Sequence, residues 1–292
     1  MNIIGISNLI LDYYFYNNEI YINNGGSVAN ILANLAYMNR KTKIIGYYGN
    51  DNNGIVAKSL LEKAGVNTSL LEMKNYNTKC FFINKETTST CPFCGNKTKN
   101  YKLNLDIEKR ITSDDIILIQ DYTLLPNIKN KICLDLGYYN KFIYEDNKNI
   151  EDFIFRKYYI VNIKDTTLDF ILKKLNISFN EFLNKINIYF LIITKGKNGA
   201  SIIYNNEIYN YNVSEIKGIE TNGCGDIFLA TFIDELLDKK VINKKVIDSI
   251  FNKAQENVEI VLNNIGARNH IVKNVRIKKL KKCICQDFYL EK

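Results

Sequence analysis

The sequence predicts an α/β fold in which a mainly parallel sheet carries helices on both faces. The first observation is that short apolar runs, typical of buried strands, alternate along the chain with segments of helical periodicity. The second is that residues 26–38 carry apolar side chains at positions i, i+3, i+4, i+7 and i+8, the spacing of an amphipathic helix. Because strands that alternate with helices form parallel sheets, we expect ligands beyond the carboxyl ends of the strands.

The expected elements follow one another along most of the chain. Strands are expected at residues 2–6, 43–48, 79–84, 116–119, 132–135, 158–162, 189–194 and 200–204. Helices are expected at residues 26–38, 54–64, 166–174, 179–186, 226–237 and 246–263. Residues 12–24 and 80–104 are polar and do not fit the alternation, so they are expected to form a small β lid. No repeat or low-complexity linker interrupts the chain, which predicts a single domain over residues 1–292.

Composition and charge argue against several classes of protein. The 292 residues are 46% hydrophobic and 24% charged, which is usual for a globular protein with a real core. The net charge of +8 is scattered and aromatic side chains do not interleave with a basic stripe, so we expect no nucleic-acid binding. No apolar run approaches the roughly 18 residues of a membrane helix, and the N-terminus lacks a secretory pattern. We therefore expect a cytoplasmic protein without a membrane partner.

A glycine-punctuated turn runs directly into an apolar helix at residues 220–237. Gly223 and Gly225 let the backbone turn tightly and approach a ligand. The N–H groups of residues 223–226 would lack intrahelical partners, and the helix dipole adds positive charge, so the turn is a candidate anion site. Asp226 would repel a phosphate unless it takes a proton from an attacking hydroxyl group. This combination indicates phosphoryl transfer to an alcohol; the alternative is an Asp that only caps a buried helix.

A second glycine-rich element, at residues 24–30, opens an earlier helix. Gly25 and Gly26 would let the backbone press against a small polar ligand, and the amide of Asn30 can both donate to and accept from a hydroxyl group. Asp12 follows the first strand, where a charged carboxylate can accept hydrogen bonds from two neighbouring hydroxyl groups. The alternatives are a solvated Asn and an Asp that begins a turn.

Together these motifs resemble the ribokinase-like (PfkB) family of carbohydrate and nucleoside kinases. The segment Glu-Thr-Asn-Gly-Cys-Gly-Asp at residues 220–226 is similar to the family signature Asp-Thr-Thr/Ser-Gly-Ala-Gly-Asp. It departs from that signature at Glu220, Asn222 and Cys224. The resemblance continues in order through residues 45–54 and 64–66, and it covers the chain from about residue 3 to about residue 270. It implies the three-layer ribokinase-like fold with a small β lid.

The resemblance also implies roles for the residues of both glycine-rich elements. Asp226 would be the catalytic base that deprotonates the acceptor. The anion hole for the transferred phosphoryl group would be formed by the N–H groups of Gly223, Cys224 and Gly225. The acceptor would be bound by Asp12, Gly25, Gly26 and Asn30.

Further elements of the same resemblance concern ATP and Mg²⁺. Asn162 and Asp165 look like the family's Asn-x-x-Glu element, with Asp in place of Glu, and a carboxylate there would hold Mg²⁺ through water. Capping of a helix by Asp165 is the alternative. The segment around Thr194 and Gly196 resembles the family's Thr-x-Gly nucleotide element, which lines the ATP site. Asn257 would border the adenine, an assignment that rests only on its position in the helix expected at residues 246–263.

One feature departs from the family. Cys91-Pro-Phe-Cys94-Gly has the spacing of a structural zinc knuckle, which supplies two of the four ligands that zinc requires. The other ligands could come from Cys283 and Cys285, from Cys80, or from a partner subunit. A redox dithiol and two unligated thiols are the alternatives. The seven cysteines and the absence of a secretory pattern favour reduced thiols over disulfides.

The expected activity is ATP-dependent phosphorylation, with Mg²⁺, of a hydroxyl group on a sugar or sugar-like molecule. A nucleoside or a fructosamine-type conjugate is an alternative acceptor, and a non-catalytic sugar- or nucleotide-binding regulator is an alternative function. The chain has a single histidine, His270, so catalytic triads and multi-histidine metal sites are not expected. A homodimer formed through the lid is a further hypothesis.

Overall fold

The structure is a computed structural model. It describes residues 1–84, 87–88, 90–93, 95, 102–121, 128–137, 150, 153–154, 156–213, 218 and 220–278. Two compact units are present, one within residues 111–216 and the other within residues 2–110 and 217–292. We call them the central unit and the terminal unit, and each is described by itself.

The terminal unit is built on three parallel strands in the order β1-β4-β5. These strands are β1 (Ile3–Ile6), β4 (Thr42–Gly49) and β5 (Asn67–Lys74). Its helices are α1 (Ser27–Tyr37), α2 (Asn52–Lys63), α7 (Cys224–Leu237) and α8 (Lys244–Leu262), and it includes a short 3-10 helix at Glu108–Arg110. Eight residues of α7 are buried, which follows from its almost wholly apolar sequence.

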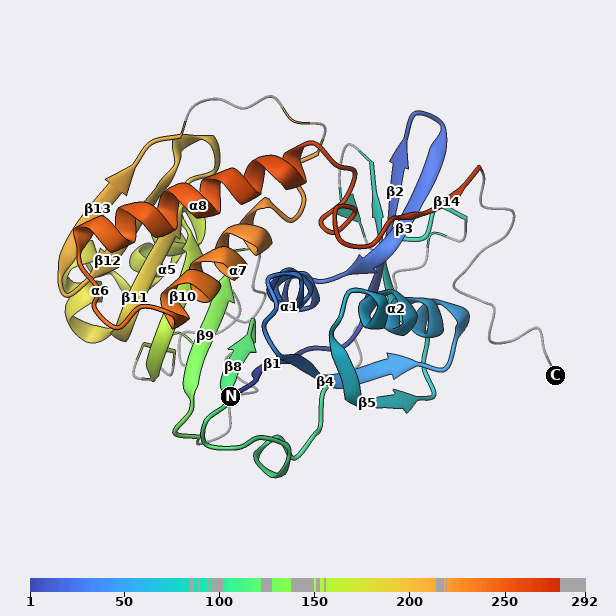
Figure 1. Ribbon diagram of the computed structural model, residues 1–292, viewed down its shortest axis with the longest axis horizontal. Helices are drawn as coiled ribbons and strands as arrows, with labels where there is room; N and C mark the ends of the chain where they lie inside the picture. The colour runs from blue at the N-terminus through green and yellow to red at the C-terminus, as the bar shows by residue number, and fades with distance from the viewer. Residues whose placement is uncertain are drawn as a thin grey trace. The chain divides into compact units, whose positions relative to one another are not determined.

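A second sheet of the terminal unit has the order β14-β3-β2-β6-β7. Its strands are β2 (Ile10–Tyr16), β3 (Glu19–Gly25), β6 (Lys79–Ile83), β7 (Thr87–Thr88) and β14 (Val275–Ile277). Strands β2 and β3 form the long hairpin beside β14 in Figure 1. Asn17 and Asn18 both have positive φ, as the tight turn of such a hairpin requires. The two segments expected to form a small β lid thus contribute strands to one small sheet.

The described residues of the central unit form six strands in the order β13-β12-β11-β10-β9-β8. The parallel strands are β8 (Ile116–Ile119), β9 (Lys131–Leu136), β10 (Lys157–Lys164) and β11 (Asn187–Thr194). Two antiparallel strands follow, β12 (Ala200–Tyr204) and β13 (Glu207–Tyr211). The helices are α5 (Asp165–Leu175), α6 (Phe179–Lys185) and the 3-10 turn Gly196–Asn198.

These elements confirm the expected α/β fold with a mainly parallel sheet. Every strand and helix expected from apolar periodicity is present, with ends displaced by at most two residues. Three strands were not expected, namely β5, β13 and β14. The side chains of each strand are largely exposed or half-buried, so its sequence lacks the continuous apolar run that predicts a buried strand. Among the helices that the structure describes, none combines the length and apolar character needed to cross a bilayer.

Candidate functional site

The turn before α7 is built around Gly223. This residue caps the helix with φ of 89°, and a Cβ atom on it would lie 2.3 Å from the Cβ atom of Ala267. The carboxylate of Glu220 accepts hydrogen bonds from the N–H groups of Thr221 and Asn222, at 2.9 and 3.1 Å. Glu220, one of the departures from the family signature, therefore supports the turn. Only a residue without a side chain fits at position 223.

Cys224 and Gly225 have different environments in this turn. The N–H group of Cys224 donates to the carbonyl of Thr221 at 3.3 Å, so the turn itself uses this expected anion-hole donor. Burial, followed by the charges of Asp226 and Glu220, raises the pKa of the Cys224 thiol to about 12, which keeps it protonated. Gly225 is exposed, and a Cβ atom there would meet nothing within 4 Å. Packing within the chain therefore does not explain Gly225, which leaves its surroundings open to a ligand.

Asp226 lies in the first turn of α7 and is linked directly to α1. The amide nitrogen of Asn30 donates a hydrogen bond of 2.7 Å to Asp226 Oδ2. The amide oxygen of Asn30 is buried and has no hydrogen-bond partner. The structure thus joins the residue expected to be the base to one of the residues expected to bind the acceptor, 196 positions apart in the chain.

Asp12 lies in the middle of β2, within the β2–β3 hairpin. Its Oδ2 atom accepts a hydrogen bond of 3.1 Å from the hydroxyl of Tyr14, and its Oδ1 atom is buried without a partner. A Cβ atom on Gly25 would lie 2.1 Å from that Oδ1 atom, so Gly25 makes room for the carboxylate. Burial raises the pKa of Asp12 to about 7, Tyr14 and Arg268 lower it, and Asp226 raises it. Asp12 and Asp226 therefore influence each other electrostatically.

Arg268 is a buried cation that interacts electrostatically with both carboxylates. It is 1% exposed, and its Nη2 atom donates to the backbone carbonyl of Asn24. Its Nε and Nη1 atoms are buried without hydrogen-bond partners. Burial lowers the pKa of Arg268 to about 10, while electrostatic interactions with Asp12, Tyr14 and Asp226 raise it. Nothing in the local sequence singles out Arg268, because a basic residue in a polar C-terminal stretch is usually exposed.

His270 extends the same network. Asn34 donates to the backbone carbonyl of Asn30 at 2.9 Å, which leaves its amide oxygen to accept from His270 Nε2 at 3.0 Å. Burial, followed by the charges of Arg268 and Lys273, lowers the pKa of His270 to about 4. The imidazole is therefore neutral and a weak base near pH 7, and its hydrogen bond to Asn34 links it to α1.

The central unit carries a separate buried polar cluster at the carboxyl ends of neighbouring parallel strands. Asn162, at the end of β10, donates to Asp135 Oδ1 at 2.7 Å, and Gln120 donates to Asp135 Oδ2 at 3.1 Å. The N–H group of Gly137 also donates to Asp135, at 3.0 Å. Burial raises the pKa of Asp135, and these hydrogen bonds lower it. Asn162 was expected here, whereas Asp135 and Gln120 were not, although each follows or ends an apolar run.

The remaining residues expected to bind ATP and Mg²⁺ in the central unit lie at strand ends and turns. Asp165 is the first residue of α5, is half-buried, and accepts a hydrogen bond from the N–H group of Thr166 at 2.7 Å. This carboxylate has the hard oxygen atoms that Mg²⁺ prefers. Thr194 ends β11, and its hydroxyl donates to the carbonyl of Ile163 at 3.4 Å. Gly196 has φ of 56° and open space where a side chain would be.

Asn257 lies between the helices of the terminal unit. Its amide donates to the hydroxyl of Thr231 at 2.9 Å, which ties α8 to α7. It also lines a small pocket of about 180 Å³, together with residues of α1, α7 and α8 and with His270. This hydrogen bond gives Asn257 a packing role, and its contact with adenine stays a prediction.

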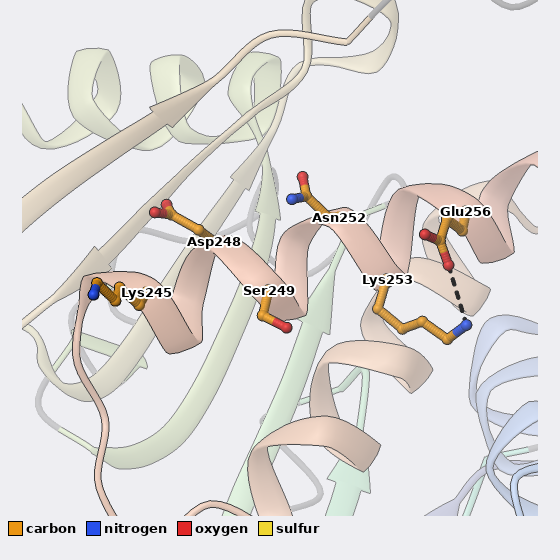
Figure 2. A pocket seen from close by; sticks show the side chains of 6 residues that line it. All are labelled: Lys245, Asp248, Ser249, Asn252, Lys253 and Glu256. Atoms are coloured by element: carbon orange, nitrogen blue, oxygen red, sulfur yellow. Dashed lines mark hydrogen bonds and ion pairs between the residues drawn. The ribbon is translucent and has the colours of Figure 1, made fainter.

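A broader hollow of about 480 Å³ lies along the outer face of α8. Figure 2 shows its lining, and all six side chains come from this one helix: Lys245, Asp248, Ser249, Asn252, Lys253 and Glu256. Lys253 is paired with Glu256 at 3.1 Å. A single solvated helix face of balanced charge gives no indication of a specific ligand.

The zinc hypothesis falls partly outside the described residues, which do not include Cys94, Cys283 or Cys285. Cys80 and Cys91 are both buried. The pKa of Cys80 is raised well above its usual value, mainly by burial and then by Asp51, Asp12 and Cys91. Within the described ranges, no group of three or more His, Cys, Asp or Glu residues is arranged to hold a metal ion.

Metal analysis of purified protein tests the hypothesis directly. If the knuckle at Cys91 and Cys94 binds zinc, protein never exposed to a chelator should contain zinc at a near-stoichiometric level: one equivalent per chain, or half an equivalent where two subunits share one ion. Cys94→Ser should lose that metal and lower the melting temperature, because structural zinc contributes folding free energy. Wild-type protein without zinc would remove the hypothesis.

The comparison with protein families gives one match that spans most of the chain. The model described as "pfkB family carbohydrate kinase" matches residues 9–254. A curated protein of Buchnera aphidicola subsp. Schizaphis graminum (strain Sg), named "Uncharacterized sugar kinase", is 27% identical over 151 residues. These residues are 44% of this chain and 48% of that protein, so the match spans about half of the relative's length.

The solved structures that resemble this chain match it over nearly its full length. Fructokinase from Vibrio cholerae O395, with fructose, ADP and calcium ion bound, has a TM-score of 0.74 at 16% identity. That match covers 93% of this chain and 96% of the fructokinase. Aminoimidazole riboside kinase from Salmonella enterica, with aminoimidazole riboside and an ATP analog, has a TM-score of 0.70 at 14% identity, over 92% and 96% of the two chains. At these identities the likeness establishes the ribokinase-like fold.

Proposed function

The chain belongs to the pfkB family of carbohydrate kinases, and we propose that it transfers the γ-phosphoryl group of ATP to a hydroxyl group of a sugar or sugar-like molecule. The single observation that carries this proposal is the hydrogen bond between Asn30 and Asp226. It links a carboxylate at a helix N-terminus to the glycine-rich element that opens α1. A proton acceptor, an anion-binding turn and polar groups for hydroxyls therefore come together in the terminal unit.

Asp226 is the general base in this proposal. Its carboxylate takes the proton of the acceptor hydroxyl as that oxygen attacks the γ-phosphorus of ATP, and the bond from this phosphorus to the bridging oxygen breaks to release ADP. The hydrogen bond from Asn30 to Oδ2 orients the carboxylate in the first turn of α7. The N–H groups of Gly223 and Gly225 stabilise the charge on the transferred group, since they lie at the positive end of α7.

In this proposal the acceptor is bound by buried polar groups that lack hydrogen-bond partners in the free protein. Asp12 Oδ1 and Asn30 Oδ1 are buried acceptors without partners, and hydroxyl groups of a bound molecule would satisfy both. Gly25 and Gly26 let the acceptor approach the backbone at the start of α1.

Asn162, Asp165, Thr194 and Gly196 are proposed to bind Mg²⁺ and ATP. The carboxylate of Asp165 would hold Mg²⁺ through water, and the bound ion would neutralise phosphate charge. The open space at Gly196 would let the backbone approach the nucleotide. The likeness to kinases with ATP or ADP bound supports this assignment.

A nucleoside-type acceptor is the second candidate. It is favoured by the likeness to a kinase structure that holds aminoimidazole riboside, while the fructokinase structure holds a free sugar. A fructosamine-type conjugate and a non-catalytic binding protein are the further alternatives. The cytoplasmic location and the lid-mediated homodimer stay predictions; light scattering of the purified chain would test the dimer.

The test is ATP consumption with Mg²⁺ against a panel of sugars, amino-sugars, fructosamines and nucleosides. Turnover with one class of acceptor, dependent on Mg²⁺, is the expected result. Binding of ATP or a sugar without turnover, seen as a rise in melting temperature, would favour the non-catalytic alternative.

A further inference from the structure

We propose that Arg268 is the positioning residue of the acceptor site: its buried positive charge keeps the carboxylate of Asp12 ionised beside that of Asp226, so that Asp12 can accept hydrogen bonds from the acceptor. This inference rests on the proposed kinase function for its consequence, but its electrostatic part concerns the free protein. It concerns a residue that no sequence motif selected.

The two residues before Arg268 are closely packed against other parts of the terminal unit, and this packing fixes the position of Arg268. Gly266 has φ of 79°, and a Cβ atom there would lie 2.8 Å from the ring of Tyr14. Ala267 lies against Gly223, where a Cβ atom would meet it at 2.3 Å. The segment 266–268 is therefore held between β2, which carries Asp12, and the turn that leads to Asp226.

Among the described residues, no carboxylate lies within hydrogen-bonding range of the Arg268 guanidinium. Its single hydrogen bond is to the carbonyl of Asn24, and its Nε and Nη1 atoms are buried without partners. A buried unpaired cation is unfavourable unless negative charge lies nearby. The electrostatic partners of Arg268 are Asp12, Tyr14 and Asp226, so its charge acts on this site.

Three titratable groups act on the pKa of Asp12: Tyr14 on the same strand, which donates to it, Asp226 on α7, and Arg268 in the C-terminal segment. A fourth group, the thiol of Cys80 on β6, has its own pKa raised by Asp12. Tyr14 and the Cys80 thiol are neutral near pH 7, because the pKa of each is raised well above its ordinary value. Asp226 disfavours ionisation of Asp12, so Arg268 is the charged group that favours it.

The burial of Asp12 sets the direction of the pH effect. Its pKa is raised to about 7, so the carboxylate is protonated as the pH falls through neutrality. A protonated Asp12 loses the negative charge that strengthens its bonds to hydroxyl groups. In the wild type, acceptor affinity is therefore expected to fall as the pH drops below 7. In a variant with a neutral residue at position 268, this fall should begin at a higher pH.

The test measures the ionisation of Asp12 in the protein without substrate. Aspartate carboxyl carbons are labelled with ¹³C, the Asp12 resonance is identified by its loss in Asp12→Asn, and its titration is followed by NMR. In Arg268→Met the midpoint should rise by about one pH unit or more, because an opposite charge has been removed from a buried site. Arg268→Gln, which keeps a donor for the Asn24 carbonyl, is measured beside it in case the Met variant does not fold.

Two further variants separate charge from shape. Arg268→Lys keeps the charge and should leave the midpoint nearer to wild type than Met or Gln does. Arg276→Met removes an exposed arginine of the same unit, whose partner is Glu19, and should leave the midpoint unchanged. A midpoint that does not move in a folded Met or Gln variant overturns the proposal, as does a Lys variant that shifts as far as Met.

The second part of the test is kinetic, and it uses the acceptor that the wild-type protein phosphorylates in the kinase panel. Arg268→Met should raise the KM for that acceptor about tenfold near pH 7, with a smaller effect on kcat, and the loss should diminish at alkaline pH. If wild type phosphorylates nothing, the proposed function fails while the NMR titration still decides the role of Arg268. If turnover is normal and the titration is unchanged by Arg268→Met, only this inference fails.

Discussion

Asp226→Asn is expected to lower kcat roughly 10³-fold, within the range usual for removal of a general base. The change removes the proton acceptor but keeps an amide oxygen that can accept the hydrogen bond from Asn30, so the fold should be preserved. The measurement is initial-rate phosphotransfer with saturating ATP and the acceptor found in the panel, together with the melting temperature of each variant.

Glu235→Gln is the matched control for this variant. Glu235 lies on the same helix, nine residues after Asp226, and its half-exposed carboxylate is paired with Lys239 at 3.4 Å. Loss of this carboxylate should leave kcat within a factor of about two, since ion pairs open to solvent contribute little. Near-normal turnover in Asp226→Asn, or an equal loss in Glu235→Gln, would show that Asp226 is not the base.

Gly223→Ala and Gly225→Ala are expected to have opposite effects on stability although they lie two residues apart. Gly223 has φ of 89° and no room for a Cβ atom against Ala267, so alanine there should destabilise the protein by about 1–3 kcal/mol or more. Gly225 lies within α7 with nothing near its missing side chain. Alanine there should leave stability unchanged or raise it by up to about 1 kcal/mol.

The phosphotransfer activity of the two alanine variants is the second property to compare. If a phosphoryl group approaches the backbone at Gly225, the added methyl group should lower kcat/KM for ATP at least tenfold without loss of folded protein. Each alanine variant thus serves as the control for the other, with chemical denaturation and phosphotransfer measured on both. A stable Gly225→Ala variant with full activity would mean that no ligand comes close to this turn.

Elements with strong local periodicity could be predicted from the sequence. The helices at 26–38, 226–237 and 246–263 have continuous apolar faces, and the structure contains α1, α7 and α8 at these positions. Strands with mixed side chains, such as β5 and β13, could not be predicted, because their pairing with neighbours rather than their own composition makes them strands.

The candidate site divides in the same way. The turn at 220–226 was recognisable because glycine at fixed spacing before an apolar helix has a local physical meaning, and Gly223 has the positive φ that this meaning requires. Asp135 and Gln120 were not selected, since a polar residue at the end of an apolar strand has many explanations until its neighbours are known.

The sequence by itself determined the α/β fold, the family and the residue types of the two glycine-rich elements, because each depends on spacing along the chain. Only the tertiary structure decided that Asn30 contacts Asp226, and that Arg268 lies buried against Asn24, 244 positions away. The physical reason is that burial and pairing of charges depend on which distant segments pack together. The spacing of residues along the chain does not determine those contacts.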